Sequence, residues 1–124
     1  MKTFYSEKHK LRDAKTELFG GQLVQPFERP SRAQYIYDRI SEVGLGPIVA
    51  PEDHGMDPIL AIHDAKFVQF LQNAWGLWEA EGFKGEALPT CWPARRMSDK
   101  KPNFIEGQLG YYALASETSF TKGT

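Results

Sequence analysis

Three histidines are the first residues to consider for metal or acid–base chemistry: His9, His54 and His63. A protein zinc site needs three or four ligands, and a helical site places two histidines four residues apart around a glutamate. None of the three histidines has this spacing. Aspartates adjoin two of them, at Asp53 and Asp64, but adjacent side chains do not converge on one ion in a helix or a strand. We therefore interpret the histidines as capping or hydrogen-bonding residues and predict neither a metal site nor a catalytic residue.

The single cysteine, Cys91, lies between two prolines in the sequence Pro-Thr-Cys-Trp-Pro. A catalytic thiolate needs a base, together with a cation or a helix N-terminus that lowers its pKa. Arg95 and Arg96 are close in sequence, but no base can be identified, so we interpret Cys91 as an ordinary loop thiol. Serine-nucleophile motifs and a phosphate-binding glycine loop are also absent, and Gly20-Gly21 indicates only a turn.

Two carboxylates offer a different chemistry. Glu17 and Glu106 lie in polar, turn-rich segments, and aromatic residues are close by at Phe19, Phe27 and Phe104. A carboxylate beside aromatic rings can bind an ammonium group through its charge and through contact with the ring faces. The alternative is that both acids are solvated surface residues, which is the commoner fate of a loop glutamate.

Length and composition exclude several classes of protein. The chain has 124 residues, enough for one domain but not for two. Fifteen basic and sixteen acidic residues give a net charge of −1, so we expect neither nucleic acid nor a membrane surface as a partner. One cysteine excludes an internal disulfide, and the charged N-terminus has no apolar signal region. We expect a cytoplasmic protein.

One helix is predicted with defined ends. Ala33, Ile36, Tyr37, Ile40 and Val43 recur at helical spacing and predict a helix over 31–43. Ser31 and Gln34 have the spacing of a capping box, which makes Ser31 the predicted N-cap. Gly44 is well placed to end the helix.

The remaining segments predict a mostly helical α/β chain that forms a single partial domain over residues 1–124. Two short strands cannot form a stable sheet alone, so we expect further chain or self-association to complete the core. The predicted elements are strands at 2–5 and 46–51, a short helix through Ile62 with Asp57 as its N-cap, a helix over 65–81 capped by Asp64, a last helix over 110–118, and long loops at 6–29 and 82–109.

Several segments together resemble a known family, in order and over essentially all 124 residues. They are 15–21 (Lys-Thr-Glu-Leu-Phe-Gly-Gly), 26–28, 30–33, 54–55, 63–65, 70–75, 82–87, 92–96, 105–112 and 115–118. The sequence is similar to the start of bacterial acetylpolyamine amidohydrolases, which share a superfamily with arginase and the histone deacetylases. The resemblance implies that this segment supplies the first strands and helices of a parallel sheet flanked by helices.

The resemblance also implies roles for particular residues. By position, Glu17 and Glu106 match acids that attract the cationic polyamine, and Phe27 matches an aromatic residue of the substrate tunnel. The zinc ligands of the family, an Asp-x-His motif and a distant aspartate, lie beyond the matched region, as do its paired histidines and catalytic tyrosine. No Asp-x-His motif and no pair of adjacent histidines occurs here. We therefore expect no cofactor and no catalysis by this chain alone.

Three functions remain open from the sequence. The first is a truncated acetylpolyamine amidohydrolase-like protein without activity. The second is a small module that binds polyamines or a protein partner. The third is half of a split zinc-dependent deacetylase. In each case the apolar faces of helices 31–43 and 65–81 lack a partner, so we expect a homodimer or a higher oligomer.

Overall fold

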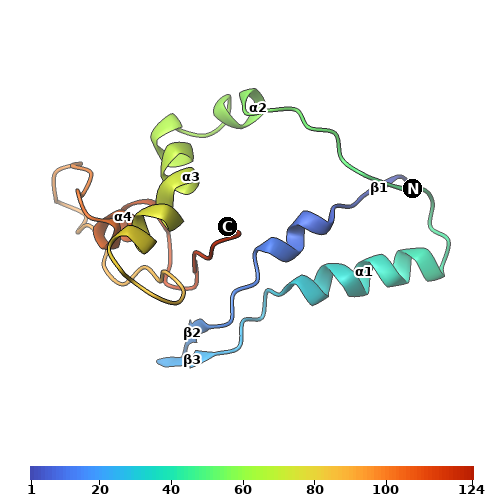
Figure 1. The fold of residues 1–124 in the computed structure, drawn as a ribbon, viewed down its shortest axis with the longest axis horizontal. Helices are drawn as coiled ribbons and strands as arrows, with labels where there is room; N and C mark the ends of the chain where they lie inside the picture. Colours follow the sequence, from blue (N-terminus) through green and yellow to red (C-terminus); the bar gives the residue numbers. More distant parts are fainter.

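The computed structural model describes residues 1–124 as two lobes joined by a short helix (Figure 1). The N-terminal lobe, residues 1–50, contains β1 (Thr3–Phe4), the 3-10 helix η1 (Glu7–Leu11), β2 (Glu17–Phe19), β3 (Gln22–Val24), α1 (Pro30–Glu42) and β4 (Ile48–Val49). Helix α2 (Asp57–Leu60) links it to the C-terminal lobe, residues 65–124, which contains α3 (Ala65–Ala80) and α4 (Ile105–Tyr112).

The two predicted strands are confirmed, and they pair with each other. β1 and β4 run parallel, with Thr3 opposite Ile48 and Phe4 opposite Val49. A parallel pair requires a crossover connection, and here the crossover contains α1. The chain is therefore α/β, as the sequence predicts.

The predicted loop over residues 6–29 is wrong, because this segment contains η1 and a β-hairpin. Ser6 caps η1 by accepting a hydrogen bond from the backbone of Lys8. β2 and β3 pair antiparallel around Gly20 and Gly21, whose φ angles are 58° and 79°. Two successive positive φ angles form the type I′ turn that suits the twist of a hairpin, and glycine adopts them without strain.

Helix α1 begins one residue before its predicted cap. The N-cap is Arg29, which makes no side-chain capping bond, and Pro30 is the first helical residue. Proline suits this position because its φ is already helical and its missing N–H would have no partner there. The predicted end is confirmed, since Gly44 has a φ of 60° and its N–H donates to the carbonyl of Ser41 at 3.2 Å.

The caps of α2 and α3 differ in how well local sequence predicts them. Asp57 is the first residue of α2 and not its cap, so that prediction is wrong by one position. Asp64 does cap α3, and its carboxylate accepts hydrogen bonds from the backbones of Lys66 at 2.9 Å and Phe67 at 3.2 Å. The aspartate thus satisfies two N–H groups that the first helical turn leaves without partners.

The last helix lies five residues earlier than predicted, over 105–112 and not 110–118. Gly107 suggests a loop and Gly110 the start of the helix, but both residues occupy the interior of α4. A Cβ on Gly107 would lie 2.7 Å from the Pro102 Cβ, and one on Gly110 would lie 1.5 Å from the Cys91 carbonyl oxygen. The two glycines therefore allow the loop before α4 to pack directly on its backbone.

The hydrophobic core lies almost wholly in the C-terminal lobe, between α3 and α4. Ala87 and Phe120 pair as an isolated antiparallel bridge and close this core at its base. In the N-terminal lobe only Ala14 and Pro26 are buried, and α1 has no buried residue. The buried cluster comprises Phe70, Ala74, Ala87, Ile105, Leu109, Ala113 and Phe120.

Candidate functional site

Two of the residues singled out in the sequence, Glu17 and Phe27, meet at the base of the hairpin. Glu17 is the first residue of β2, and its Oε2 accepts a hydrogen bond from the backbone N–H of Phe27 at 3.1 Å. The Phe27 ring packs edge-on against Phe19, with their centroids 5.7 Å apart. Because the hairpin turn folds β3 back along β2, residues ten positions apart become neighbours.

Glu17 lines a hollow of about 330 Å³ between the hairpin and the C-terminal segment. Three carboxylates border the hollow, from Glu17, Glu28 and Glu117, with one guanidinium, from Arg12. Glu28 also forms an ion pair with Arg32. The other residues that line the hollow are Thr16, Pro26 and Ser119.

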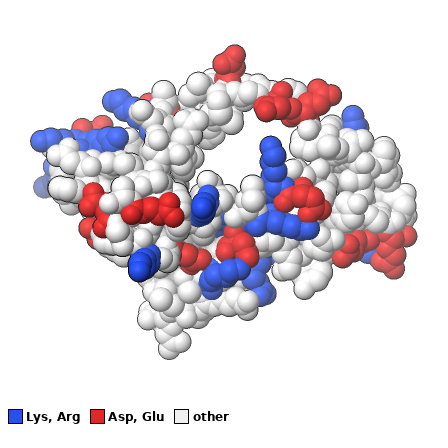
Figure 2. Space-filling view, in the orientation of Figure 1, with Lys and Arg blue, Asp and Glu red and all other residues white.

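The hollow spans the two lobes. The Arg12 Nη2 group donates to the Ser119 carbonyl and hydroxyl oxygens, at 3.5 Å each, and so connects η1 to the C-terminal segment. Lys, Arg, Asp and Glu side chains gather along the lower side of the opening between the lobes (Figure 2). No local sequence pattern predicts that Glu117, a hundred residues further along the chain, lies beside Glu17.

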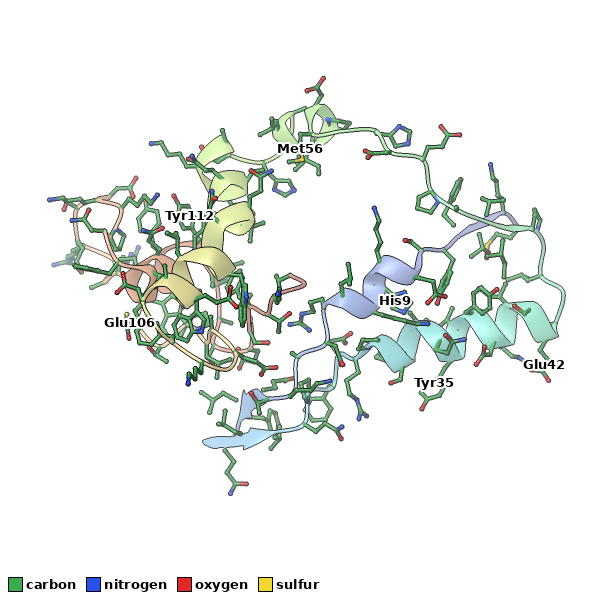
Figure 3. All side chains as sticks on the ribbon, in the orientation of Figure 1. His9, Tyr35, Glu42, Met56, Glu106 and Tyr112 are labelled. Atoms are coloured by element: carbon green, nitrogen blue, oxygen red, sulfur yellow. The ribbon has the colours of Figure 1, made fainter.

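Glu106 lies elsewhere in the molecule. It is an exposed residue in the first turn of α4, and it does not line the hollow. It comes from α4 in the C-terminal lobe, whereas Glu17 and Phe27 lie at the hairpin of the N-terminal lobe (Figures 1 and 3). Within one chain the structure therefore brings Glu17 and Phe27 together but leaves Glu106 apart. The Phe27 ring also lies outside the lining of the hollow and is 62% exposed.

Glu86 is a further residue that sequence reasoning missed. Its carboxylate accepts hydrogen bonds from the Lys15 backbone, from the Thr16 N–H at 2.9 Å and from the Thr16 hydroxyl at 2.5 Å. Partial burial alone would raise the pKa of Glu86. The hydrogen bonds from Thr16 and Lys15, helped by the charge of Arg12, outweigh it and hold the pKa below its usual value. Glu86 thus fastens the segment before β2, and with it Glu17, to the C-terminal lobe.

We expect Glu86→Gln to lower the free energy of unfolding by about 1 kcal/mol at about pH 7, because a charged acceptor is lost at a partly solvated position. A lowered folded-state pKa contributes stability above the unfolded pKa of about 4.3, and that contribution disappears as the pH falls through the folded pKa. The difference between the two proteins should therefore vanish at low pH. Urea unfolding across this range measures it, and Glu81→Gln, at an exposed acid without partners, is the control.

The residues do not form a zinc site. Nowhere does the structure bring together three or more His, Cys, Asp or Glu side chains in a group able to hold a metal ion. His9 has the hydrogen-bonding role that we predicted, with its Nδ1 2.7 Å from the Ser6 carbonyl oxygen. Cys91 is exposed, and its Sγ lies 4.0 Å from the Glu106 carbonyl oxygen. No helix is long and apolar enough to cross a membrane.

Known proteins are similar to this chain along its whole length. The sequence is 51% identical over 124 residues to acetylpolyamine amidohydrolase of Mycoplana ramosa, and 46% identical to acetylpolyamine amidohydrolase 2 of Pseudomonas aeruginosa. The chain resembles part of an acetylpolyamine amidohydrolase. Each alignment covers all of this chain but 36% of the relative, so the chain spans about a third of the length of these bacterial hydrolases. No family model matches.

The fold, like the sequence, matches part of a larger protein. The structure of acetylpolyamine aminohydrolase from Burkholderia pseudomallei superposes with a TM-score of 0.85 and covers 100% of this chain, but 36% of that one. At 24% identity this comparison supports the fold alone. The comparisons confirm both the resemblance and the partial α/β architecture predicted from the sequence.

Proposed function

We propose that these 124 residues form the substrate-entry part of an acetylpolyamine amidohydrolase-like protein, bind polyamine cations, and do not hydrolyse them alone. The observation that carries this proposal is the hollow at Glu17, where three carboxylates face one guanidinium. The names of the relatives supply the class of ligand, since an acetylpolyamine is a flexible chain that carries ammonium groups.

The arrangement of charges suits such a ligand. Glu28 is paired with Arg32, and Arg12 donates to the neutral oxygens of Ser119, so neither Glu17 nor Glu117 forms an ion pair within the chain. Because Glu17 and Glu117 come from different lobes, an extended polyamine could bridge them. Glu17 is half-buried and Glu117 is exposed, and each pairing with a cation is worth about 0.5–1 kcal/mol at such positions. We therefore expect weak binding that falls as the salt concentration rises.

Titration of spermidine into the chain, followed by calorimetry at low ionic strength, tests this proposal. We expect the double variant Glu17→Gln with Glu117→Gln to bind about tenfold more weakly, because two charge pairings are lost. Glu79→Gln removes an exposed charge on α3, away from the hollow, and should leave the affinity unchanged. Glu106→Gln, made alone, should weaken binding less than Glu17→Gln. Equal affinities for the wild-type chain and the double variant would contradict the proposal.

The second part of the proposal is the absence of activity in the isolated chain. Zinc-assisted amide hydrolysis needs three protein ligands and an open coordination position, and no such group forms here. We expect the purified chain, supplied with zinc and acetylputrescine, to release acetate no faster than buffer with zinc alone. The Mycoplana ramosa relative, assayed in parallel, is the positive control. Zinc-dependent acetate release by the chain would overturn this part.

A further inference from the structure

The C-terminal lobe contains another hollow, where α3 and α4 lie side by side (Figure 1). Its volume is about 480 Å³, a size typical of small-molecule sites. Four amide side chains line it, from Gln69, Gln72, Asn73 and Gln108, with one ammonium group, from Lys101. No carboxylate borders it, and it shares no residue with the hollow at Glu17. A different class of ligand is therefore expected here.

Gln108 presents a fixed acceptor to this hollow. The residue is only 6% exposed, and its Nε2 group donates to the Asn103 carbonyl at 3.1 Å. A backbone carbonyl can only accept a hydrogen bond, so the amide cannot be turned end for end. The Oε1 atom thus faces away from Asn103 and has no partner within the chain. It is available to an N–H group of a bound molecule.

Asn73 is oriented in the same way. Its Nδ2 group donates to the Gln69 carbonyl at 2.7 Å, one turn earlier in α3, which leaves Oδ1 as a second acceptor. Gly76 lies three residues further along the same face of the helix. Nothing lies within 4 Å of a Cβ at Gly76, so the hollow stays open beside Asn73. The hollow therefore offers two amide oxygens in fixed orientations.

The remaining groups are a cation and an apolar wall. Lys101 is exposed and forms no ion pair within the chain, so its ammonium group can bind an anionic group. Leu77, which is 41% exposed, supplies apolar surface. A polyamine does not suit these groups, because a further ammonium beside Lys101 would be repelled. A molecule with one ammonium and one carboxylate matches them.

We infer that this hollow binds a free amino acid in its zwitterionic form. The ammonium group donates to the amide oxygens of Gln108 and Asn73. The carboxylate pairs with Lys101, and the hydrocarbon part contacts Leu77. Because the acceptors are neutral and the one cation is exposed, we expect an affinity in the millimolar range. The inference does not depend on the proposed function, since the carboxylates proposed to bind spermidine lie in another hollow, and either can fail while the other holds.

Nuclear magnetic resonance of the isotope-labelled chain tests the inference, with L-leucine and β-alanine as probes. The two differ in the separation between ammonium and carboxylate, and the tighter binder reports the separation that the hollow accepts. We expect at least one of them to shift the side-chain amide signals of Asn73 and Gln108 to saturation. Propylamine and propionate, which each carry one of the two charged groups, should bind at least about fivefold more weakly. The inference fails if neither amino acid binds, or if propylamine or propionate binds as tightly.

Variants test the size of the hollow and its charge separately. Gly76→Leu fills the hollow and should weaken binding of the tighter amino acid at least about tenfold, while its Cβ meets no neighbour. Lys101→Gln should weaken it about fivefold, whereas Lys100→Gln, at an exposed lysine that does not line the hollow, leaves it unchanged. Circular dichroism of each variant verifies its fold. Unchanged affinity in Gly76→Leu, or equal losses in the two lysine variants, would place the amino acid outside this hollow and so refute the inference.

Discussion

Gly110→Ala is expected to lower the free energy of unfolding by about 3 kcal/mol, the upper range for overpacking a close contact. The added Cβ would lie 1.5 Å from the Cys91 carbonyl oxygen and 2.7 Å from the Cys91 carbonyl carbon. Backbone atoms cannot rotate away as a side chain can. Either α4 or the loop before it must move, and Leu109, which is almost fully buried, would lose its packing against α3.

Gly76→Ala provides a matched control, since it places the same methyl group in a helix interior. Nothing lies within 4 Å of a Cβ at Gly76, so the substitution adds no clash. Alanine should instead stabilise α3 by about 0.5–1 kcal/mol, because it restricts the unfolded chain more than glycine does. Chemical unfolding followed by far-ultraviolet circular dichroism measures both variants. Equal stability of the two variants would show that the loop does not pack on α4 as closely as described.

Gly107 also shows why sequence reasoning placed the start of the last helix five residues too late. Glycine is an unfavourable helix residue, so residues 105–109 were assigned to the preceding loop. These residues are nevertheless helical, and the loop packs on α4 through Pro102 at Gly107 and Cys91 at Gly110. Such tertiary contacts form only when the chain is folded.

Asp64 and Gly44 were predicted correctly because each bonds to groups within a few residues of it. At Ser31 and Asp57, where a proline begins the helix or follows its first residue, the predicted cap lies one or two residues too late.

The candidate site likewise combines residues that the sequence predicts with residues that only the folded structure brings together. Glu17 and Phe27 were predicted from their residue types and from the family resemblance, and the hairpin turn between them is sufficient to bring them together. Glu117 and Glu86 reach the same region from the C-terminal lobe, about 100 and 70 residues further along the chain. No local pattern marks a carboxylate whose partner is set by the meeting of two lobes.

The open surfaces have a consequence for the isolated chain. Large apolar side chains are exposed in the N-terminal lobe. They include Ile36 on α1 at 58%, Val43 at the C-cap of α1 at 48%, and Phe19 and Leu23 on the hairpin at 60% and 61%. Association commonly covers exposed apolar side chains where they form larger patches. A second copy of the chain is always available for this purpose.

We therefore expect the purified chain to self-associate, with light scattering giving at least twice the chain mass of 14.1 kDa at concentrations of tens of micromolar. Ile36→Ser together with Leu23→Ser should shift the midpoint of association to about tenfold higher concentration, because about 1.4 kcal/mol of apolar burial is lost. Tyr111→Phe, which removes a hydroxyl that donates to Asp99 in the C-terminal lobe, is the control. A single-chain mass at every concentration up to about 100 micromolar would contradict the prediction.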